Sequence, residues 1–105
     1  MKVPTLVNIK DVKSTTLYKP TYIGLGSYYG NQWSQVYPRK RAIREYEDVW
    51  RAHLFGPHTR YRIELQERLA DLDGATLLCH CYPKPCHGDV LIKLFKEVFR
   101  DIIGV

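Results

Sequence analysis

The residues best suited to chemistry are concentrated between positions 79 and 89. All three cysteines of the 105-residue chain lie there, together with two of its four histidines and, just beyond them, an aspartate: Cys79, His80, Cys81, Cys86, His87 and Asp89. Thiol, imidazole and carboxylate groups perform nucleophilic and acid–base catalysis, and they also bind metals. An odd number of cysteines, none of them elsewhere in the chain, does not suggest a disulfide framework and is typical of a reducing compartment.

Local sequence patterns predict a strand before this cluster and a helix after it. An apolar run from Ala75 to Cys81 indicates a strand, and Pro83 and Pro85 interrupt it. Apolar residues then recur at helical spacing, which predicts a helix from Asp89 to about Ile103, with Asp89 as its cap. The cluster would therefore lie at the carboxyl end of a strand and the amino end of a helix. There the helix dipole attracts anions and lowers a thiol pKa.

One interpretation of the cluster is a reactive or anion-binding site. Cys86 would be the nucleophile or redox centre, and His87 or His80 the general acid or base. Asp89 would orient the histidine or a ligand hydroxyl. A simpler variant has His87, the N–H of Gly88 and Asp89 bind a phosphate or ribose without covalent chemistry.

A second interpretation is a metal site. Cys79, Cys81, Cys86 and His87 form the ligand set of a tetrahedral zinc site or part of an iron–sulfur site. Neighbouring residues such as Cys86 and His87 rarely reach one ion, and structural zinc sites usually take ligands from two separated knuckles. A purely structural role also stays open, with Cys79 filling volume in the core and Asp89 acting only as a helix cap.

A second candidate site is the glycine-rich segment 24–31, Gly-Leu-Gly-Ser-Tyr-Tyr-Gly-Asn, which follows a predicted strand from Thr21 to Ile23. Glycines after a strand let the backbone approach a phosphate closely. The segment completes neither a Walker motif nor a dinucleotide-binding fingerprint, so an ordinary turn is the alternative.

The remaining patterns predict the rest of the fold. We expect a strand at Thr5–Ile9, a loop from Lys10 to Pro20, a helix from Arg39 to about Phe55 and a helix from Thr59 to Asp71. A continuously apolar strand before the cysteines is typical of the interior of a parallel sheet. We therefore predict one domain over residues 1–105. Its class is α/β, a compact Rossmann-like fold of two or three layers, with a mainly parallel sheet of three to four strands and about three helices.

Composition limits the possible partners. The formal net charge of +5 is compatible with a polyanionic partner, although solvated arginines on helices would give the same excess. The sequence contains no apolar run of the ~20 residues that span a bilayer, and it begins without the apolar segment of a signal peptide. We expect a cytoplasmic location and no membrane partner.

The motifs together resemble the family called domain of unknown function 4326, found in phages and bacteria. The resemblance rests on Val7-Asn8, on Tyr22-Ile23-Gly24-Leu25-Gly26-Ser27 with Gly30-Asn31, on Arg39 with Ile43 and Tyr46, and on residues 79–91. Leu25 stands where the family pattern usually has arginine, and His80 where it usually has tryptophan. The strand and Cys-His loop are also similar to another uncharacterised family, number 488. The resemblance implies a Rossmann-type sheet with a site at its carboxyl edge, and a host cytoplasm if the chain is phage-encoded. It implies no reaction.

Our leading hypothesis is a small protein that binds a nucleotide, a nucleobase or another phosphorylated ligand, and that could be an enzyme of nucleotide or nucleic-acid modification. The ligand would lie between the glycine segment and the Cys-His loop. Cys86, His87 and Asp89 would form the polar centre and Arg39 would pair with phosphate, with further contacts from Asn8, Gly24, Gly26, Ser27, Asn31, Cys81 and Gly88. The alternative is a zinc-stabilised module that binds nucleic acid or a host protein.

Overall fold

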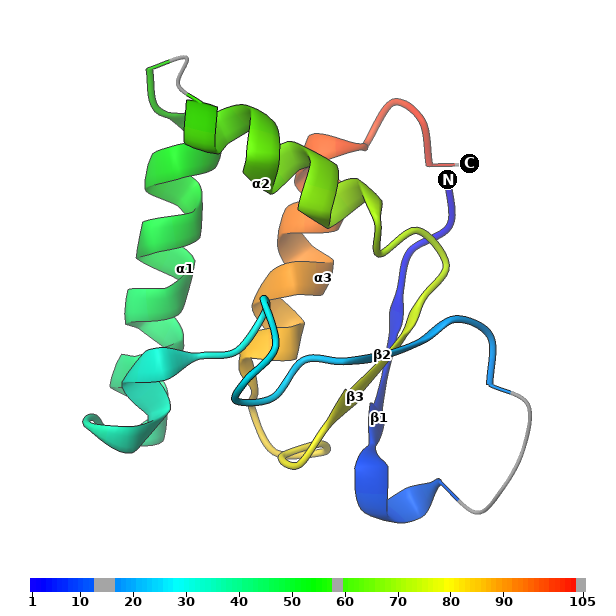
Figure 1. Cartoon of the computed structure of the whole chain (residues 1–105), viewed down its shortest axis with the longest axis vertical. Coiled ribbons are helices and arrows are strands. Elements are labelled where there is room, and N and C mark those ends of the chain that lie inside the picture. The colour runs from blue at the N-terminus through cyan, green and yellow to red at the C-terminus, as the bar shows by residue number, and fades with distance from the viewer. Residues whose placement is uncertain (13–16, 58–59, 104–105) are drawn as a thin grey trace.

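A computed structural model shows a small parallel sheet packed against helices (Figure 1). It describes residues 1–12, 17–57 and 60–103. The strands are β1 (Thr5–Asn8), β2 (Pro20–Tyr22) and β3 (Thr76–Cys79), and the α-helices are α1 (Arg39–Phe55), α2 (Arg60–Ala70) and α3 (His87–Val98). Two short 3-10 helices are η1 (Ile9–Asp11) and η2 (Gln32–Gln35). The described residues thus confirm the predicted α/β class, the parallel sheet of three strands and the three helices.

The central strand of the sheet is β3. The strand order is β1-β3-β2 and both pairings are parallel, with Asn8 opposite Cys79 and Tyr22 opposite Leu78. The central place suits β3 because its Thr-Leu-Leu-Cys sequence has no charged side chain to solvate, and most of it is buried. All three strands therefore end at one edge of the sheet, and β2 and β3 end immediately before the glycine segment and the Cys-His loop.

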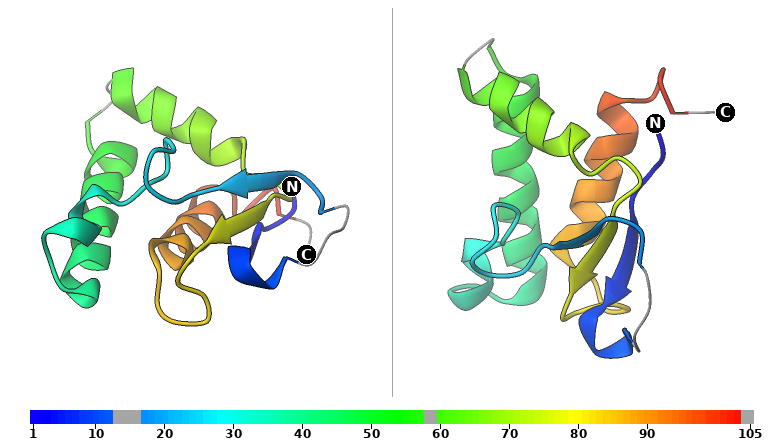
Figure 2. Two further views of the ribbon diagram at one scale, coloured as in Figure 1. Left: turned by 60° about the horizontal axis from the view of Figure 1, so that its bottom comes forward. Right: turned by 45° about the vertical axis from the view of Figure 1, so that its right-hand side comes forward.

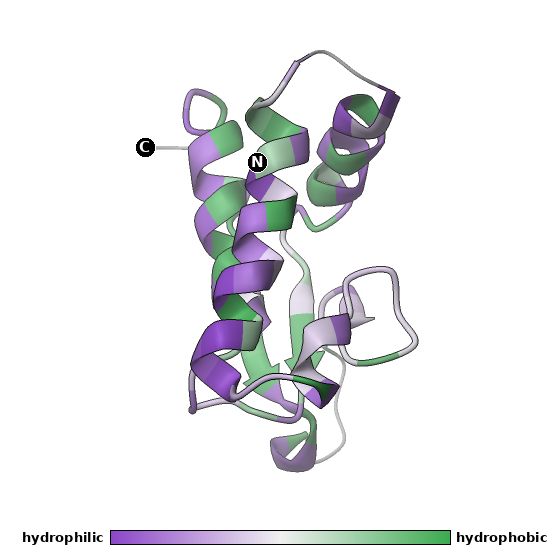
Figure 3. Cartoon of the chain, turned by 90° about the vertical axis from the view of Figure 1, so that its left-hand side faces the viewer, coloured by the Kyte–Doolittle hydropathy of each residue, from purple (hydrophilic) through white to green (hydrophobic). Residues whose placement is uncertain are grey.

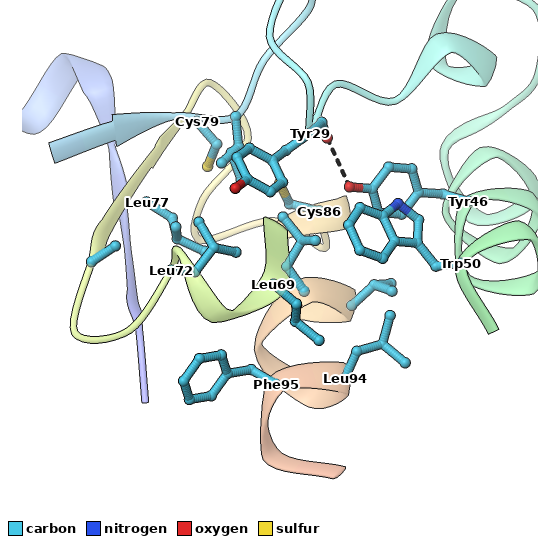
Figure 4. Packing of buried hydrophobic residues seen from close by; sticks show 14 of the residues in the cluster. Tyr29, Tyr46, Trp50, Leu69, Leu72, Leu77, Cys79, Cys86, Leu94 and Phe95 are labelled. Carbon is cyan, nitrogen blue, oxygen red and sulfur yellow. Dashed lines mark hydrogen bonds between the residues drawn. The ribbon is translucent and has the colours of Figure 1, made fainter. Parts of the chain in front are cut away.

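The helices gather on one side of the sheet. Figures 1 and 2 show α3 lying between the sheet and α1, and α2 crossing near the ends of both helices. The apolar stripe of α3 supplies much of the core, because Leu91, Leu94 and Phe95 are fully buried. Trp50 of α1 and Leu69 of α2 belong to the same cluster (Figure 4). No helix in the described part of the chain is long and apolar enough to cross a bilayer.

The segment after β2 is fastened to α1 by two buried hydrogen bonds. The Tyr46 hydroxyl donates to the Tyr29 carbonyl at 2.7 Å (Figure 4), and the Asn31 amide nitrogen donates to the Ala42 carbonyl at 3.0 Å. Burial raises the pKa of Tyr46, so this hydroxyl keeps its proton. These bonds fix the glycine segment relative to the first turns of α1.

Element boundaries differ from the prediction where a loop begins. Strand β3 ends at Cys79, so Cys81 lies beyond the strand and does not share a strand face with Cys79. Ile9 belongs to η1, β2 ends at Tyr22 one residue early, and α3 begins at His87 and ends at Val98. Part of the predicted loop, residues 13–16, and the predicted helix start at Thr59 lie outside the described residues.

Candidate functional site

Two adjoining cavities lie where β2 and β3 end. The Arg39 cavity, of about 260 Å³, is lined by Asn31, Ser34, Arg39, Ala42, Ile43, Cys81, Pro85, Cys86 and His87. The His80 cavity, of about 180 Å³, is lined by Gly24, Leu25, Asn31, Ser34, Cys79, His80, Cys81 and His87. Both therefore have Asn31, Ser34, Cys81 and His87 in their walls. The glycine segment and the Cys-His loop face shared space at this edge.

His87 connects the two halves of the site. Its Nε2 lies 2.6 Å from the carbonyl oxygen of Ile23, and a carbonyl only accepts, so Nε2 carries the proton and donates. In the neutral ring, Nδ1 then presents a lone pair toward Cys86 Sγ at 3.7 Å. The imidazole also packs edge-on against Tyr46, with ring centroids 5.1 Å apart. The end of β2 is thereby held to the start of α3.

Burial lowers the pKa of His87 below its ordinary 6.5, although the Ile23 carbonyl and Asp89 act in the opposite direction. The folded state therefore binds this proton less readily than the unfolded chain, in which the pKa is near 6.5. The stability that neutral His87 provides is present above pH 6.5 and is lost as the pH falls through the lowered folded pKa. We expect the free energy of unfolding to decrease over this range.

Urea unfolding at a series of pH values below neutrality measures this effect. Because a glutamine does not titrate and its amide can still donate a hydrogen bond, His87→Gln should flatten the pH dependence above about pH 5, where the carboxylates remain charged. An unchanged pH profile in His87→Gln would show that another group controls stability in this range.

Cys86 and Asp89 form the cap of α3. Cys86 is the N-cap, its Sγ accepts from the Gly88 N–H at 3.3 Å, and an Asp89 carboxylate oxygen accepts from the Cys86 N–H at 3.1 Å. This reciprocal pairing is a capping box. The Asp89 carboxylate is thus engaged by the Cys86 backbone rather than by the imidazole of His87, whose Nε2 bonds Ile23. The two residues predicted as nucleophile and orienting acid both stabilise the helix terminus.

The prediction of a lowered thiol pKa at Cys86 is wrong. The residue is only 2 % exposed, and this burial raises its pKa from 9.0 to about 12; the Gly88 N–H opposes the shift, and the neighbouring Cys79 thiol adds to it. Desolvation outweighs the helix dipole because the side chain lies inside the core cluster rather than in solvent. Cys86 is therefore a neutral, buried thiol at ordinary pH.

The other two cysteines differ in their access to the site. Cys79 is buried and its Sγ accepts from the Tyr82 N–H at 3.4 Å, whereas Cys81 is partly exposed and lies in the walls of both cavities. Within the described ranges, no group of three or more histidine, cysteine or acidic side chains is placed to hold a metal ion. The predicted zinc set of Cys79, Cys81, Cys86 and His87 is therefore not assembled there.

Arg39 lines its cavity and links α1 to the Cys-His loop. Its Nη1 donates to the Pro85 carbonyl at 3.0 Å, which joins the first residue of α1 to the Cys-His loop. Pro38 is the N-cap of α1 and provides no side-chain hydrogen bond, and the first turn contains no acidic residue. The amino end of α1 thus combines uncapped N–H groups with a guanidinium beside a cavity, an arrangement that attracts anions.

The glycine segment is shaped mainly by its own hydrogen bonds. Gly24 lines the His80 cavity, and its carbonyl accepts from both the N–H (3.1 Å) and the hydroxyl (2.8 Å) of Ser27. Gly26 has a φ of +91°, which other residues rarely adopt. A Cβ on Gly30 would lie 2.7 Å from the Gly24 carbonyl oxygen. Gly26 and Ser27 therefore form the turn and are not among the cavity-lining residues.

Three further residues predicted to contact the ligand have roles in the fold itself. The Asn8 amide donates to the Tyr82 carbonyl at 2.7 Å and its oxygen caps η1, so it anchors the Cys-His loop from outside both cavities. Asn31 lines both cavities, but its side chain bonds Ala42 and the Trp33 N–H. Gly88 allows α3 to approach the sheet, because a Cβ there would lie 2.6 Å from Leu6 Cδ1.

Part of the cavity wall was not predicted from the sequence. Ser34 belongs to both cavities, and Ala42, Ile43, Pro85 and Leu25 complete one or the other. Ala42 could be recognised only as a helix core position, Ile43 and Leu25 were named only in the family resemblance, and Ser34 lies in a polar stretch with no motif. The spacing of Ile43 four residues after Arg39 was the one available signal, since it puts both on one face of the helix.

Comparison with known proteins identifies a family for this chain, and neither that family nor the relative below has a described activity. The chain is 46 % identical over 33 residues to an "Uncharacterized 12.4 kDa protein in nrdA-td intergenic region" of Enterobacteria phage T4. That match covers 31 % of this chain and 31 % of the relative, so the chain spans about a third of the curated relative it matches. No solved structure matches the chain. Residues 7–97 match the family described as "Domain of unknown function (DUF4326)", and the chain belongs to this family.

Proposed function

We propose that the protein binds a small phosphorylated, nucleotide-like ligand at the carboxyl edge of its sheet. The observation that carries the proposal is the Arg39 cavity, where the start of α1, the start of α3 and the end of β3 meet around one hollow. In open α/β sheets of the Rossmann kind, ligands bind outside the carboxyl ends of the strands. The Arg39 cavity has the corresponding position in this sheet.

Charge supports a phosphate at Arg39. A guanidinium offers a planar fork of donors that fits phosphate oxygens, and the adjacent uncapped helix terminus favours negative charge. Only one Arg39 nitrogen, Nη1, is hydrogen-bonded to Pro85. Among the described residues the other N–H groups of Arg39 have no hydrogen-bond partner, so they remain available to a ligand while that bond positions the side chain.

The shape of the second cavity supports an apolar, planar portion of the ligand. Leu25, Cys79 and His80 are among the residues that line the His80 cavity. A nucleobase combines a flat apolar face with polar edges, which suits a pocket of mostly apolar wall with few polar groups. Phosphate would lie at Arg39, and the base would extend toward His80.

Binding is better supported than covalent catalysis. Cys86 is a buried neutral thiol and Asp89 is engaged in the helix cap, so neither is poised for a reaction. The zinc-stabilised module is the alternative, and the geometry of the described residues favours it less because no metal-ligand group is assembled.

The test is titration of the protein with adenosine, guanosine, cytidine and uridine 5′-monophosphates, and with inorganic phosphate, followed by backbone amide NMR. We expect at least one nucleotide to shift amides in both the 24–34 and 79–88 segments. Charge-assisted hydrogen bonds contribute roughly 1.5–3 kcal/mol, so Arg39→Ala should weaken binding about 10- to 100-fold.

Arg44→Ala is the matched control for this titration. Arg44 is an exposed arginine on the same helix but does not line the cavity, so the variant should leave nucleotide affinity nearly unchanged. Absence of binding by every nucleotide, or amide shifts confined to another surface such as the hollow near Met1 and Tyr18, would disprove the proposal.

A further inference from the structure

A second feature of α1 lies in its first two turns, on the solvent-exposed side of the helix that begins with Arg39. Lys40, Arg41 and Arg44 are exposed, and we call these three residues the basic ridge. None of them forms an ion pair with another residue of the described chain, although acidic residues occur further along the same helix. Figure 3 shows that the lower end of α1, its amino end, is strongly hydrophilic.

In the carboxyl-terminal half of α1, by contrast, the positive charge of Arg51 is paired with acidic side chains. Arg51 donates from Nη1 and Nη2 to the two carboxylate oxygens of Glu97, at 2.8 and 2.9 Å. Its Nε donates to a Glu47 carboxylate oxygen at 2.6 Å. Glu47 also accepts from Lys93 at 3.1 Å. The positive charge of α1 that is free to meet a partner is therefore concentrated in its first two turns, the end of the helix that carries Arg39.

The positive charges in the first turn of α1 would destabilise an isolated helix. Arg39, Lys40 and Arg41 occupy the first turn, where the helix dipole disfavours cations, and no acidic residue or side-chain cap offsets them. Arg41 is held in place by stacking on Tyr37, with its guanidinium carbon 3.9 Å from the ring centroid. A bound polyanion would relieve this repulsion.

We propose that the ligand is the phosphorylated end of a single-stranded nucleic acid. With its base toward the adjoining His80 cavity, the terminal nucleotide would place its phosphate in the Arg39 cavity. The following phosphates would continue around the first turns of α1 along the basic ridge. The inference rests on the proposed function, because it takes the terminal nucleotide to be the ligand of that cavity. The planar guanidinium of arginine fits phosphate oxygens. Cβ atoms three or four residues apart on a helix are about 5–6 Å apart, so Lys40, Arg41 and Arg44 could contact successive phosphates of one strand.

A single strand fits better than a duplex. The two adjoining hollows, of about 260 and 180 Å³, can receive one nucleotide only if it is unpaired, because a base in a duplex must first be flipped out of the stack. An acidic protein would also meet the ridge, but it would have no phosphate end to place against Arg39.

The experiment measures fluorescence anisotropy with short labelled oligothymidylates that carry a phosphate at the 5′ end, at the 3′ end or at neither end. Thymidine 5′-monophosphate is the small competitor. We expect one phosphorylated strand to bind about tenfold more tightly than both the unphosphorylated strand and the monophosphate. The Lys40→Ala/Arg44→Ala double variant should weaken strand binding roughly tenfold, and it should reduce the salt slope by about 0.7 for each phosphate that is no longer neutralised.

The matched control is Lys96→Ala/Arg100→Ala, which removes one lysine and one arginine that are exposed near the far end of α3. It should leave strand affinity close to that of the wild type. The ridge variant should also leave monophosphate affinity unchanged, since neither substituted side chain lines the cavity.

Each outcome separates the two proposals. If the monophosphate binds through Arg39 but the strand binds no more tightly, this inference fails and the proposed function stands. If no probe binds, the proposed function fails and this inference fails with it. If strands bind equally with and without the terminal phosphate, or if polyglutamate displaces them equally well, the ridge is a general polyanion or acidic-protein surface and the inference is overturned.

Discussion

Iodoacetamide at neutral pH is expected to label Cys81 in the folded protein and to leave Cys79 and Cys86 unmodified. The thiolate is the reacting form, and burial raises the pKa of Cys86, so little thiolate is present there at neutral pH. Burial adds to this protection, because Cys79 is 1 % and Cys86 2 % exposed. Cys81 is partly exposed and lines both cavities.

Mass spectrometry of peptides after timed labelling measures the three rates separately. Cys81→Ser should remove nearly all labelling of the native protein, while all three sites of the wild type should react in guanidinium chloride. A saturating nucleotide should slow the labelling of Cys81 if the ligand occupies the cavities. Modification of Cys86 at the rate of Cys81 under native conditions would show that the helix cap opens readily.

Gly88→Val is expected to destabilise the fold by about 3 kcal/mol, while Gly88→Ala changes stability by about 1 kcal/mol or less. A Cβ at this position would lie 2.6 Å from Leu6 Cδ1 and 2.9 Å from Ile23 Cδ1. These are terminal methyl groups of flexible side chains, so they can move away from a single added carbon. Alanine is also the better helix former, which offsets part of the cost.

Valine adds two more carbons near Leu6 of β1 and Ile23 after β2. Ile23 is fully buried, so both side chains would have to move together within a packed core. The helix would then shift away from the sheet and loosen the bond between His87 and Ile23. Urea unfolding of both variants measures the difference in the free energy of unfolding. Similar stabilities of the valine and alanine variants would mean that the close approach of α3 is not needed.

Both results would change how the Cys-His-Gly-Asp sequence at 86–89 is understood. Four residue types associated with chemistry occur together, yet Cys86 and Asp89 cap a helix and Gly88 allows its close packing. His87 joins that helix to the end of β2 and also lines both cavities. The motif is thus largely the structural support of the site, whose walls also include Arg39 and Cys81.

Sequence patterns predicted the elements well where a pattern is local. The amphipathic period predicted α1 from Arg39 to Phe55, and the uncharged apolar run indicated a buried parallel strand, now β3. Boundaries were wrong where a cap or turn sets them, as when Cys86 serves as an N-cap although cysteine is not among the preferred residues. The 3-10 helix η2 was not anticipated because its sequence, Gln-Trp-Ser-Gln, has no period.

The sequence by itself determined the α/β class, the parallel sheet and the meeting of the glycine and Cys-His segments at one edge, because these follow from periodicity and strand direction. Only the tertiary structure decided which groups are accessible there. Burial of Cys86 among residues distant in sequence outweighs the local helix dipole, and Asp89 bonds the Cys86 backbone in preference to an imidazole. Solvation and side-chain partners depend on contacts between elements, which no local pattern encodes.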